Sequence, residues 1–343
     1  MGKGIVFAGN LIVDYVKNVS CYPPPGMLAT IFGKSRSIGG CAANTAIDIA
    51  RIDPGIPVKS IGIVGDDDDG RFVLDVLRQN GVDVASVIVS CGEETSYTDV
   101  INDSVTGERT FFHSRGANAK FSCEHIDFTS LNSSMFHIGY ALLLDSMDLP
   151  DSEYGTVMAK TLAKASDAGM LTSMDVVSES GDRFRDVVIP CLRHCDHFII
   201  NELEASLICS IEARDSSGRI LNEHMEAICK KIIALGVRKA VVVHAPEAGW
   251  YLSRKGEWLC LESLKLPAGY IKGSVGAGDA YCAGILYSIH QGLTPREGMR
   301  IARAAAAANL SEENTIDGMR SLEETLALEK EFDPDGLWSG ALR

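Results

Sequence analysis

The sequence predicts an α/β fold: a three-layer α/β/α sandwich with a mostly parallel central sheet and a small β-sheet added as a lid. Three observations predict it. Short apolar runs alternate with amphipathic stretches along almost the whole chain, which is the pattern of strand–helix–strand units. One segment interrupts this alternation with the pattern of a β-hairpin. Of the 343 residues, 46% are hydrophobic and 23% are charged, so the chain can bury a large core.

The apolar runs mark the expected strands of the central sheet. They span residues 4–9, 58–65, 135–140, 170–177, 197–201 and 239–245. Helical periodicity is found between them, at 41–52, 72–80, 154–169 and 223–236. Parallel strands joined by helices form a sheet covered on both faces, and the ligand binds at the carboxyl ends of the strands. Functional residues are therefore expected just after each strand.

The β-hairpin lies at residues 96–116. Two alternating runs, 97–102 and 108–113, flank a turn that contains Thr106 and Gly107, as is typical of hairpins. The proline-rich, non-helical segment 11–37 can supply partner strands. We expect a lid formed by about 11–37 and 93–116 that excludes water from the active edge of the sheet, within a single domain over residues 1–343.

Charge and cysteine content restrict the possible functions. A net charge of −14 at pH 7 argues against nucleic acid as a partner, because binding to a phosphate backbone needs a basic face. No stretch reaches the ~18 apolar residues of a membrane-spanning helix, and the first residues lack the apolar core of a signal peptide. The ten cysteines stand singly in apolar segments, as expected of reduced, buried thiols. We expect a cytoplasmic protein with no membrane partner and no nucleic-acid partner.

The segment 273–290, GSVGAGDAYCAGILYSIH, is the main candidate for chemistry. Its glycines surround Asp279 where an apolar helical run begins. Free N–H groups of residues 275–279 at this helix start would bind a phosphate, while Asp279 would accept the proton of an attacking hydroxyl group. This combination predicts phosphoryl transfer. The alternative is that Asp279 only caps the helix.

Asn201 and Glu204 follow the predicted strand 197–201 and have two possible roles. Their spacing is that of a capping box, which stabilises a helix start. The same two side chains could also hold water-coordinated Mg²⁺ beside nucleotide phosphates.

A third candidate region lies near the start of the chain. Asp14 comes after the first strand, and Gly39 and Gly40 precede the helix that carries Asn44. The glycines would let the backbone approach a ligand, and the side chains of Asp14 and Asn44 could hydrogen-bond the hydroxyl groups of a polyol. Turn formation is the alternative role of these residues.

At these residues the chain resembles the ribokinase-like (PfkB-type) carbohydrate kinase family, over essentially its whole length. GGCAANTAIDIARI at 39–52 is similar to the family's N-terminal glycine-pair signature. GSVGAGDAYCAGIL at 273–286 is similar to its C-terminal signature D-T-x-G-A-G-D-x-F. GIVGDDDDG, RGANA and NELEA lie between the two in family order.

The resemblance implies a ribokinase-like fold and ATP-dependent phosphorylation of a sugar-like hydroxyl group, with Mg²⁺ and with the hairpin as a lid. It assigns Asp279 as the base and the amides of Gly276, Ala277 and Gly278 as an anion hole. It implies that Asp14, Gly39, Gly40, Asn44 and Asn118 bind the acceptor, which is the sugar that receives the phosphoryl group. It implies that Asn201, Glu204, Gly249, Gly276 and Gly278 contact ATP and that Glu204 holds Mg²⁺ through water. His244, which stands in place of a family threonine, is a further candidate for contacting ATP.

The chain departs from the family pattern in two places. Gly273 and Ser274 stand where the signature has Asp and Thr. Because that Asp helps to form a monovalent-cation site in some relatives, the resemblance leaves K⁺ dependence open. Where the family often has T-x-G-x-x-G at a nucleotide-contacting strand end, residues 244–249 read HAPEAG, so Gly249 matches and His244 replaces the threonine.

We therefore expect a Mg·ATP-dependent kinase that phosphorylates a primary hydroxyl group of a small sugar or sugar acid and forms a homodimer through its lid. Arg115, just past the hairpin, is a candidate partner for an acidic group on the acceptor, since a guanidinium pairs well with a carboxylate; a solvated lid arginine is the alternative. Two other functions stay open. One is a nucleoside kinase of the same fold, and the other is a sugar-binding sensor without efficient transfer.

Overall fold

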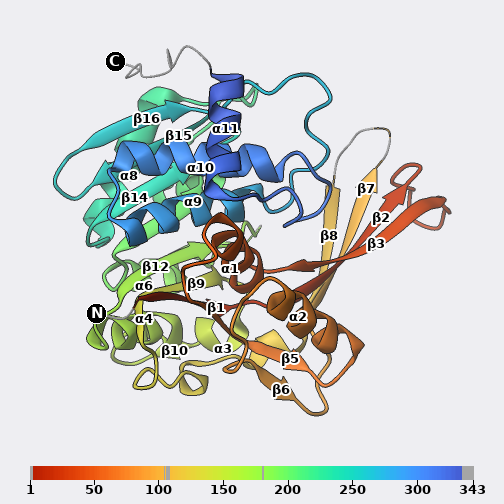
Figure 1. The fold of residues 1–343 in the computed structure, drawn as a ribbon, viewed down its shortest axis with the longest axis horizontal. Coiled ribbons are helices and arrows are strands. Elements are labelled where there is room, and N and C mark those ends of the chain that lie inside the picture. Colours follow the sequence, from red (N-terminus) through yellow and green to blue (C-terminus); the bar gives the residue numbers. More distant parts are fainter. Residues whose placement is uncertain (1–2, 104, 106–108, 180, 334–343) are drawn as a thin grey trace.

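The computed structural model of the protein describes residues 3–103, 105, 109–179 and 181–333. An eight-stranded sheet forms its centre, in the order β16-β15-β14-β13-β12-β9-β1-β4 (Figure 1). The strands are β1 (Gly4–Gly9), β4 (Val58–Ile61), β9 (Ser133–Ala141), β12 (Leu171–Val176), β13 (His197–Asn201), β14 (Ala240–His244), β15 (Ala248–Ser253) and β16 (Trp258–Glu262). All pairs from β4 to β14 are parallel, and β15 and β16 extend the sheet in antiparallel pairs. The mostly parallel sheet confirms the prediction.

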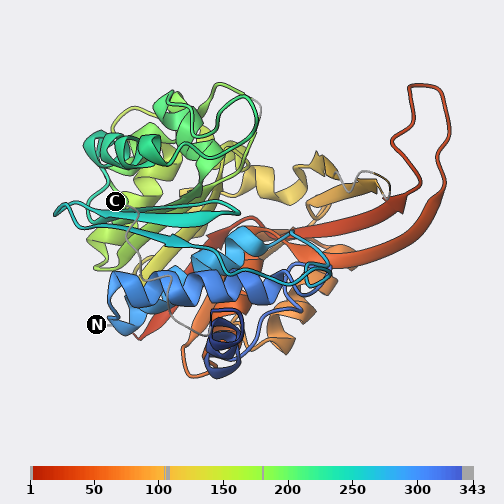
Figure 2. The same ribbon diagram turned by 90° about the horizontal axis from the view of Figure 1, so that it is seen from above.

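Two layers of helices enclose this sheet (Figure 2). One layer contains α1 (Cys41–Ile52), α2 (Asp68–Gln79), α9 (Ala277–Gln291), α10 (Pro295–Asn309) and α11 (Leu322–Phe332). The other contains α3 (Asp145–Asp148), α4 (Val157–Asp167), α5 (Phe184–Val187), α6 (Ile189–Leu192), α7 (Glu202–Cys209) and α8 (Asn222–Leu235). In the described part of the chain, every helix is too short or too polar to cross a lipid bilayer.

Strand residues alternate between the two cores. Phe198 and Ile200 of β13 pack in the core beneath α4 and α8, whereas Ile199 packs in the core beneath α1 and α9. This alternation follows from the two-residue period of a strand. Both faces of the sheet are therefore apolar, which is why the strands read as nearly continuous hydrophobic runs.

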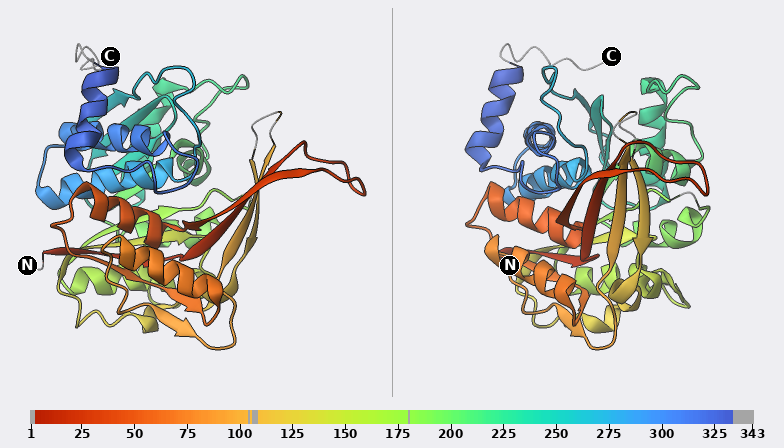
Figure 3. Two further views of the ribbon diagram at one scale, coloured as in Figure 1. Left: turned by 45° about the vertical axis from the view of Figure 1, so that its right-hand side comes forward. Right: turned by 90° about the vertical axis from the view of Figure 1, so that its right-hand side faces the viewer.

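A separate four-stranded sheet lies in the segments predicted to form a lid, and we call this sheet the lid. Its order is β3-β2-β7-β8. The strands are β2 (Ile12–Val19), β3 (Ile31–Gly39), β7 (Tyr97–Asp103) and β8 (Arg109–Ser114). The antiparallel pair β7–β8 confirms the hairpin, although its predicted turn at Thr106 and Gly107 lies outside the described residues. The lid leaves the side of the body, and the arm made by β2 and β3 extends farthest (Figure 3).

The prediction of one strand over 58–65 is wrong. β4 ends at Ile61, and β5 (Ile63–Gly65) pairs instead with β6 (Ile88–Ser90). The chain changes partners at Gly62, whose carbonyl oxygen accepts from Ile88 N (2.9 Å). A Cβ at Gly62 would lie 2.7 Å from Gly9 O, so the bare backbone lets this segment pass close to β1.

The remaining elements are short. They are β10 (Pro150–Asp151), β11 (Gly155–Thr156) and the 3₁₀ helices η1 (Gly116–Lys120) and η2 (Cys123–His125).

The helix predicted at 72–80 begins earlier, at Asp68, because Asp67 caps it: an Asp67 side-chain oxygen accepts from Gly70 N at 2.7 Å. Its acidic first turn also complements the helix dipole.

Candidate active site

A cavity of about 640 Å³ opens at the carboxyl ends of the parallel strands, beside the start of α9 and the base of the lid. Its size is typical of small-ligand sites. The predicted site residues that line it are Asp14, Gly40, Asn44, Arg115, Asn201, Glu204, His244, Gly276, Gly278 and Asp279. The fold thus brings most of the predicted residues to one edge of the sheet, as the rule for parallel α/β sheets requires.

Asp279 lies buried in the first turn of α9. Asn44 Nδ2 donates to its Oδ2 (2.8 Å), and the Tyr140 hydroxyl donates to its carboxylate, 2.8 Å from Oδ1 and 3.0 Å from Oδ2. Burial, together with the nearby charge of Asp175, raises the pKa of Asp279 to about 6, and the two hydrogen bonds oppose this rise. The carboxylate therefore faces the cavity neighbours instead of capping its own helix, and it is ionised at neutral pH.

The backbone before Asp279 presents free donors. Gly276 is the N-cap residue of α9, with a φ of 82°. The N–H groups of Gly276, Gly278 and Asp279 have no hydrogen-bond partner among the residues that the structure describes. The predicted amide of Ala277 differs, because it donates to Ser274 O at 3.5 Å, and Ala277 is not among the residues that line the cavity. The tight turn into the helix uses this amide internally.

The glycine pair before α1 lets the Asp14 side chain and the Asn10 backbone lie close to the start of this helix. A Cβ at Gly39 would lie 2.3 Å from Asp14 Oδ2, and one at Gly40, where φ is 89°, would lie 2.3 Å from Asn10 O. Gly39 therefore packs closely against Asp14 and helps to set the position of that side chain. Gly39 does not itself line the cavity. Burial raises the pKa of Asp14 to about 7, and a hydrogen bond with Thr98 opposes this rise.

Asn118 is a predicted acceptor residue that the structure keeps out of the cavity lining. Its Nδ2 donates to Leu11 O (3.1 Å), and its Oδ1 accepts from Leu11 N (3.3 Å). Both ends of the buried side-chain amide are thus bonded to the backbone that joins β1 to β2. These two hydrogen bonds fix the position of the connection between β1 and β2.

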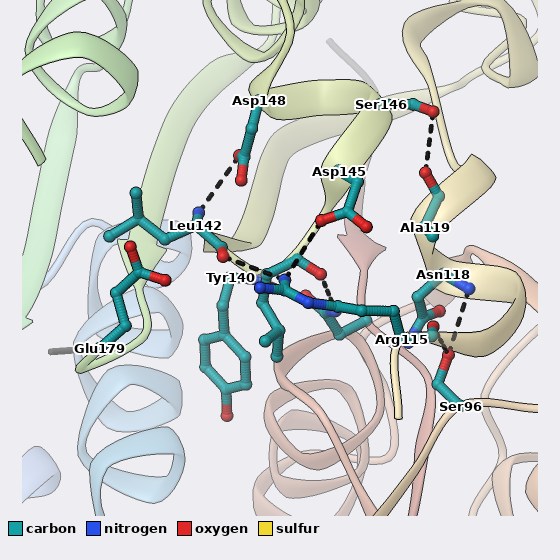
Figure 4. A network of polar contacts seen from close by, with 12 residues as sticks. Ser96, Arg115, Asn118, Ala119, Tyr140, Leu142, Asp145, Ser146, Asp148 and Glu179 are labelled. Carbon is teal, nitrogen blue, oxygen red and sulfur yellow. Dashed lines mark hydrogen bonds and ion pairs between the residues drawn. The ribbon is translucent and has the colours of Figure 1, made fainter. Parts of the chain in front are cut away.

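Arg115 lies at the rim of the cavity, one third exposed, and is neither fully solvated nor free (Figure 4). Its Nη1 donates to Leu142 O (3.0 Å) and lies 3.5 Å from Asp145 Oδ1. Leu142 has a positive φ of 76°, and its N–H donates to Asp148 Oδ1 (3.2 Å). The loop after β9 therefore holds the guanidinium in place.

Asn201 and Glu204 form the capping box that their spacing predicts. Asn201 Oδ1 accepts from Glu204 N (2.9 Å), and Glu204 Oε2 accepts from Asn201 N (3.0 Å). Ser178 Oγ donates to Glu204 Oε1 (2.8 Å). Burial raises the pKa of Glu204 to about 8. Both residues also line the cavity, so the capping role does not remove them from it.

His244 ends β14 and also lines the cavity. Its ring centroid lies 5.1 Å from that of Tyr281. Burial lowers the pKa of His244 to about 4, so the neutral imidazole offers a hydrogen bond but no positive charge. Gly249 lies opposite His244 in the β14–β15 pair, and a Cβ there would lie 2.0 Å from the Tyr281 hydroxyl oxygen. Gly249 therefore makes room for Tyr281 and is not among the lining residues.

Sequence reasoning missed several residues that line the cavity. Among them are Tyr140, Asp175 and Cys282, together with Thr98 and His113 of the lid. Tyr140 and Asp175 lie near the carboxyl ends of β9 and β12, where ligand residues are expected. That rule could have identified them, but each is embedded in an apolar run, which favours a purely structural interpretation.

The fold and the site define a protein of the carbohydrate kinase class. A family model described as "pfkB family carbohydrate kinase" matches residues 3–322. The chain therefore belongs to the pfkB family of carbohydrate kinases.

Individual relatives agree with this assignment. A ribokinase from Schizosaccharomyces pombe is 25% identical over 93% of this chain and 95% of its own length. A 5-dehydro-2-deoxygluconokinase from Shouchella clausii is 24% identical over 87% of each chain. The structure of Arabidopsis thaliana ribokinase complexed with ribose and ATP has a TM-score of 0.77 and 20% identity, covering 96% of this chain and 99% of that one. That likeness shows the ribokinase fold.

Proposed function

We propose that this protein transfers the γ-phosphoryl group of ATP to a hydroxyl group of a small sugar or sugar acid, with Asp279 as the general base. The observation that carries the proposal is the pairing of the buried Asp279 carboxylate with the free amides of Gly276 and Gly278 on one cavity. A phosphate beside a carboxylate would repel it, so the arrangement makes sense when both act on a third group. An attacking primary hydroxyl group between them is that third group.

The acceptor would lie between α1 and the lid. Asp14, Asn44 and Tyr140 supply hydrogen-bonding groups at this end of the cavity, and such groups suit the hydroxyls of a sugar. In-line transfer would follow once the acceptor is held near Asp279, since orientation and electrostatic stabilisation supply most of the rate in phosphoryl transfer. The lid would exclude water during this step.

ATP would lie along the other end of the cavity. Asn201, His244 and the start of α9 line this end, and a helix N-terminus with free amides binds phosphate. Glu204 and Asn201 offer the oxygen donors that Mg²⁺ prefers, here through water. Bound Mg²⁺ would neutralise charge on the transferred phosphoryl group.

We include no monovalent cation in the proposal. At Gly273, where the family signature has Asp, a Cβ would lie 2.8 Å from Glu313 O. An acidic side chain at this position would need the neighbouring backbone to move. The loop before α9 therefore gives no support for a K⁺ ligand here.

Arg115 is the proposed contact for an acidic group on the acceptor. The loop after β9 holds its guanidinium at the cavity rim, and an acceptor carboxylate would compete with Asp145 for it. Arg115→Ala should raise KM for sugar acids and leave KM for neutral sugars near that of the parent. Equal changes for both classes would remove this role.

We also propose a homodimer through the lid. Ile31 and Phe32 of β3 and Phe112 of β8 are exposed on the two outer strands of the lid, Phe32 by 70%. Large apolar side chains exposed at sheet edges favour contacts with another chain. In analytical ultracentrifugation Phe32→Glu should convert a dimer to a monomer. Leu207→Glu, which changes an equally apolar exposed residue on α7, should leave the dimer intact. A monomeric parent protein at micromolar concentration would contradict this proposal.

The experiment that tests the kinase proposal is an ADP-release assay with ribose, fructose, keto-deoxy sugar acids and nucleosides as acceptors, with Asp279→Asn as the baseline. A sugar that gives Mg·ATP turnover well above the baseline supports the proposal. Turnover confined to nucleosides would instead favour the nucleoside kinase, for which Phe111 on the cavity wall would contact the base. Sugar binding without turnover would favour the sensor.

A further inference from the structure

The proposed phosphoryl transfer assigns no direct role to a buried cluster beside Asp279, although two of its members line the cavity and the charge of Asp175 raises the pKa of Asp279. The cluster consists of Cys41, His137, Asp175 and Cys282, which we call the thiol–histidine cluster. The four residues come from four elements: the first turn of α1, the centre of β9, the end of β12 and the second turn of α9. His137 is fully buried, with 0% exposure, and its side chain points to the α1–α9 face of the sheet.

The donor atoms of the cluster already lie at the spacing of metal ligands. Cys41 Sγ is 3.1 Å from His137 Nε2, and Asp175 Oδ2 is 3.5 Å from the same nitrogen. Cys282 Sγ lies 4.0 Å from it. The ligand atoms of Cys41, His137 and Asp175 all lie within 4.8 Å of one another. Ligands that surround a tetrahedral Zn²⁺ at its usual bond lengths are about 3.3–3.8 Å apart, so small movements suffice.

The surroundings of His137 prepare its Nε2 for such a role. Its Nδ1 lies 2.8 Å from Ser173 Oγ. With a proton on Nδ1 donated to Ser173, the lone pair of Nε2 faces the sulfur atoms. Metal-binding histidines are commonly oriented by a second hydrogen bond of this kind.

Asp175 has a carboxylate oxygen that is available to bind a metal ion. Its buried Oδ1 has no hydrogen-bond partner within the described part of the chain, and buried carboxylate oxygens are normally paired. Asp175 and Cys41 can lie close together because residue 139 is a glycine. A Cβ at Gly139 would lie 1.7 Å from Asp175 Oδ1 and 2.7 Å from Cys41 Sγ. The bare backbone of β9 thus admits both groups to the same small space.

We propose that the thiol–histidine cluster binds a borderline divalent cation of the Zn²⁺ type. Thiolate, imidazole and carboxylate together are the donor set of Zn²⁺, whereas Mg²⁺ and Ca²⁺ prefer oxygen donors alone. Binding would release the thiol proton of each coordinating cysteine to solvent. This site is separate from the Mg²⁺ site proposed at Glu204, and the proposal does not depend on the kinase reaction.

Co²⁺ is the probe for the test, because tetrahedral Co²⁺ bound to thiolate absorbs in the visible and near-ultraviolet. In this experiment the reference protein, called the parent here, is the double variant Cys21→Ser, Cys91→Ser, in which two exposed thiols are removed. It is first dialysed against a chelator. We expect one equivalent of Co²⁺ to bind with a thiolate charge-transfer band and to be displaced by Zn²⁺. Since changes around ligands already cost 10–100-fold in affinity, Cys41→Ser and His137→Gln should each weaken binding by at least about 100-fold.

Cys229→Ser is the matched control, because Cys229 is a buried thiol of α8 in the core on the opposite face of the sheet. It should leave the spectrum and affinity unchanged. The proposal is overturned if the parent binds no Co²⁺, or if binding persists in Cys41→Ser and His137→Gln. It is overturned equally if Cys229→Ser weakens binding as much as they do. Thermal melts without metal check that each variant is folded, and Cys282→Ser, with an expected weakening and a weaker charge-transfer band, replaces any variant that is not.

Discussion

The hydroxyl oxygen of Tyr140, at the end of β9, lies 2.8 Å from Oδ1 and 3.0 Å from Oδ2 of Asp279, in the first turn of α9. The two residues are 139 positions apart in the sequence. The contact orients the carboxylate of the proposed base, and it also lowers the pKa of that carboxylate against the effect of burial.

In a plot of kcat/KM against pH, the acid limb is the range at low pH over which activity falls as the proposed base is protonated. Tyr140→Phe should move this limb to higher pH. Loss of the hydrogen bond raises the pKa of Asp279 above its present value of about 6. Hydrogen bonds to charged groups contribute about 1.5–3 kcal/mol, so we expect kcat/KM to fall by about 2- to 15-fold at pH 7 and to change little at pH 9. The control is Tyr287→Phe, about two turns further along α9, which should behave as the parent. An unchanged pH profile for Tyr140→Phe would refute the positioning role.

The parent enzyme should lose activity as the pH falls through 7 and 6. Asp279, with a pKa of about 6, accepts a proton only when ionised, and Asp14, with a pKa of about 7, titrates in the same cavity. The titratable groups that act on Asp279 or are acted on by it are Asp14, Cys41, Asp48, His137, Tyr140, Asp175 and Cys282.

Two coupled carboxyl groups should make the acid limb broader than a single ionisation. Asp14→Asn should narrow the acid limb, because one of the two carboxyl groups that titrate near pH 6–7 is then removed. Glu204, with a pKa of about 8 in the same cavity, titrates in both proteins and does not contribute to the difference. The measurement is kcat/KM between pH 5 and 9 at saturating Mg·ATP. A limb in Asp14→Asn that is as broad as that of the parent would contradict this assignment.

Asp279→Asn should lower kcat by about 10²–10⁴-fold, the usual contribution of a general base, while ATP binding stays nearly intact. The same change should stabilise the fold at pH 8. Since the pKa of Asp279 is raised from 3.8 in the unfolded chain to about 6, its ionisation destabilises the native state above pH 6. That cost disappears as the pH falls toward 4.

Urea unfolding at two pH values measures this effect. The variant should exceed the parent by about 1–3 kcal/mol at pH 8, and the difference should be close to zero at pH 4. A variant that is less stable at pH 8 would show that the carboxylate stabilises the fold, and wild-type turnover on the identified acceptor would refute the assignment of the base.

Gly39→Ala should impair acceptor binding selectively. The new methyl group would lie 2.3 Å from Asp14 Oδ2 and would push that short side chain from its position, so KM for the acceptor should rise about tenfold or more while KM for ATP stays constant. Gly33→Ala in the same strand is the control, because its Cβ would meet Asn18 at an ordinary 3.6 Å. Similar kinetics for the two variants would mean that the position of Asp14 is not critical.

Glu204→Gln should separate capping from ion binding. The measurement is made at pH 9, because burial raises the pKa of Glu204 to about 8 and the carboxylate is ionised only above that value. Glutamine retains an oxygen that can accept from Asn201 N, so the helix start survives, but it lacks the negative charge that supports Mg²⁺. We expect KM for Mg·ATP to rise about tenfold with little change in the melting temperature. Glu297→Gln alters the capping box of α10 and should change neither quantity. If Glu204→Gln also leaves KM unchanged, capping is the whole role of Glu204.

Much of the fold could be predicted because it depends on local patterns. The helix at 41–52 was predicted to the residue, since its start is marked by the glycine pair and its apolar positions repeat with helical spacing. The hairpin β7–β8 was predicted from two alternating runs around a turn. The division of 58–65 at Gly62 could not be foreseen, because a continuous apolar run does not reveal which neighbour each half will pair with.

The candidate site was partly predictable for the same reason. Asn44 and Asp279 lie in the first turns of helices that follow conspicuous glycines, and Asp14 lies shortly after the Gly9 that ends β1. Tyr140, His137 and Asp175 are instead hidden in apolar strands. The partners of Arg115 and Asn118 come from the loops after β9 and β1, and no spacing rule connects them to these residues.

The sequence by itself determined the layers, the strand–helix order and the turn that presents Asp279, because these depend on neighbouring residues along the chain. Tertiary structure alone decided which side chains meet that carboxylate, how its pKa shifts, and that two thiols, an imidazole and a second carboxylate share a space beneath it. Those outcomes depend on distances between elements that lie far apart in the sequence, such as the 96 positions between Cys41 and His137 and the 235 between Asn44 and Asp279, and on the removal of water from around them.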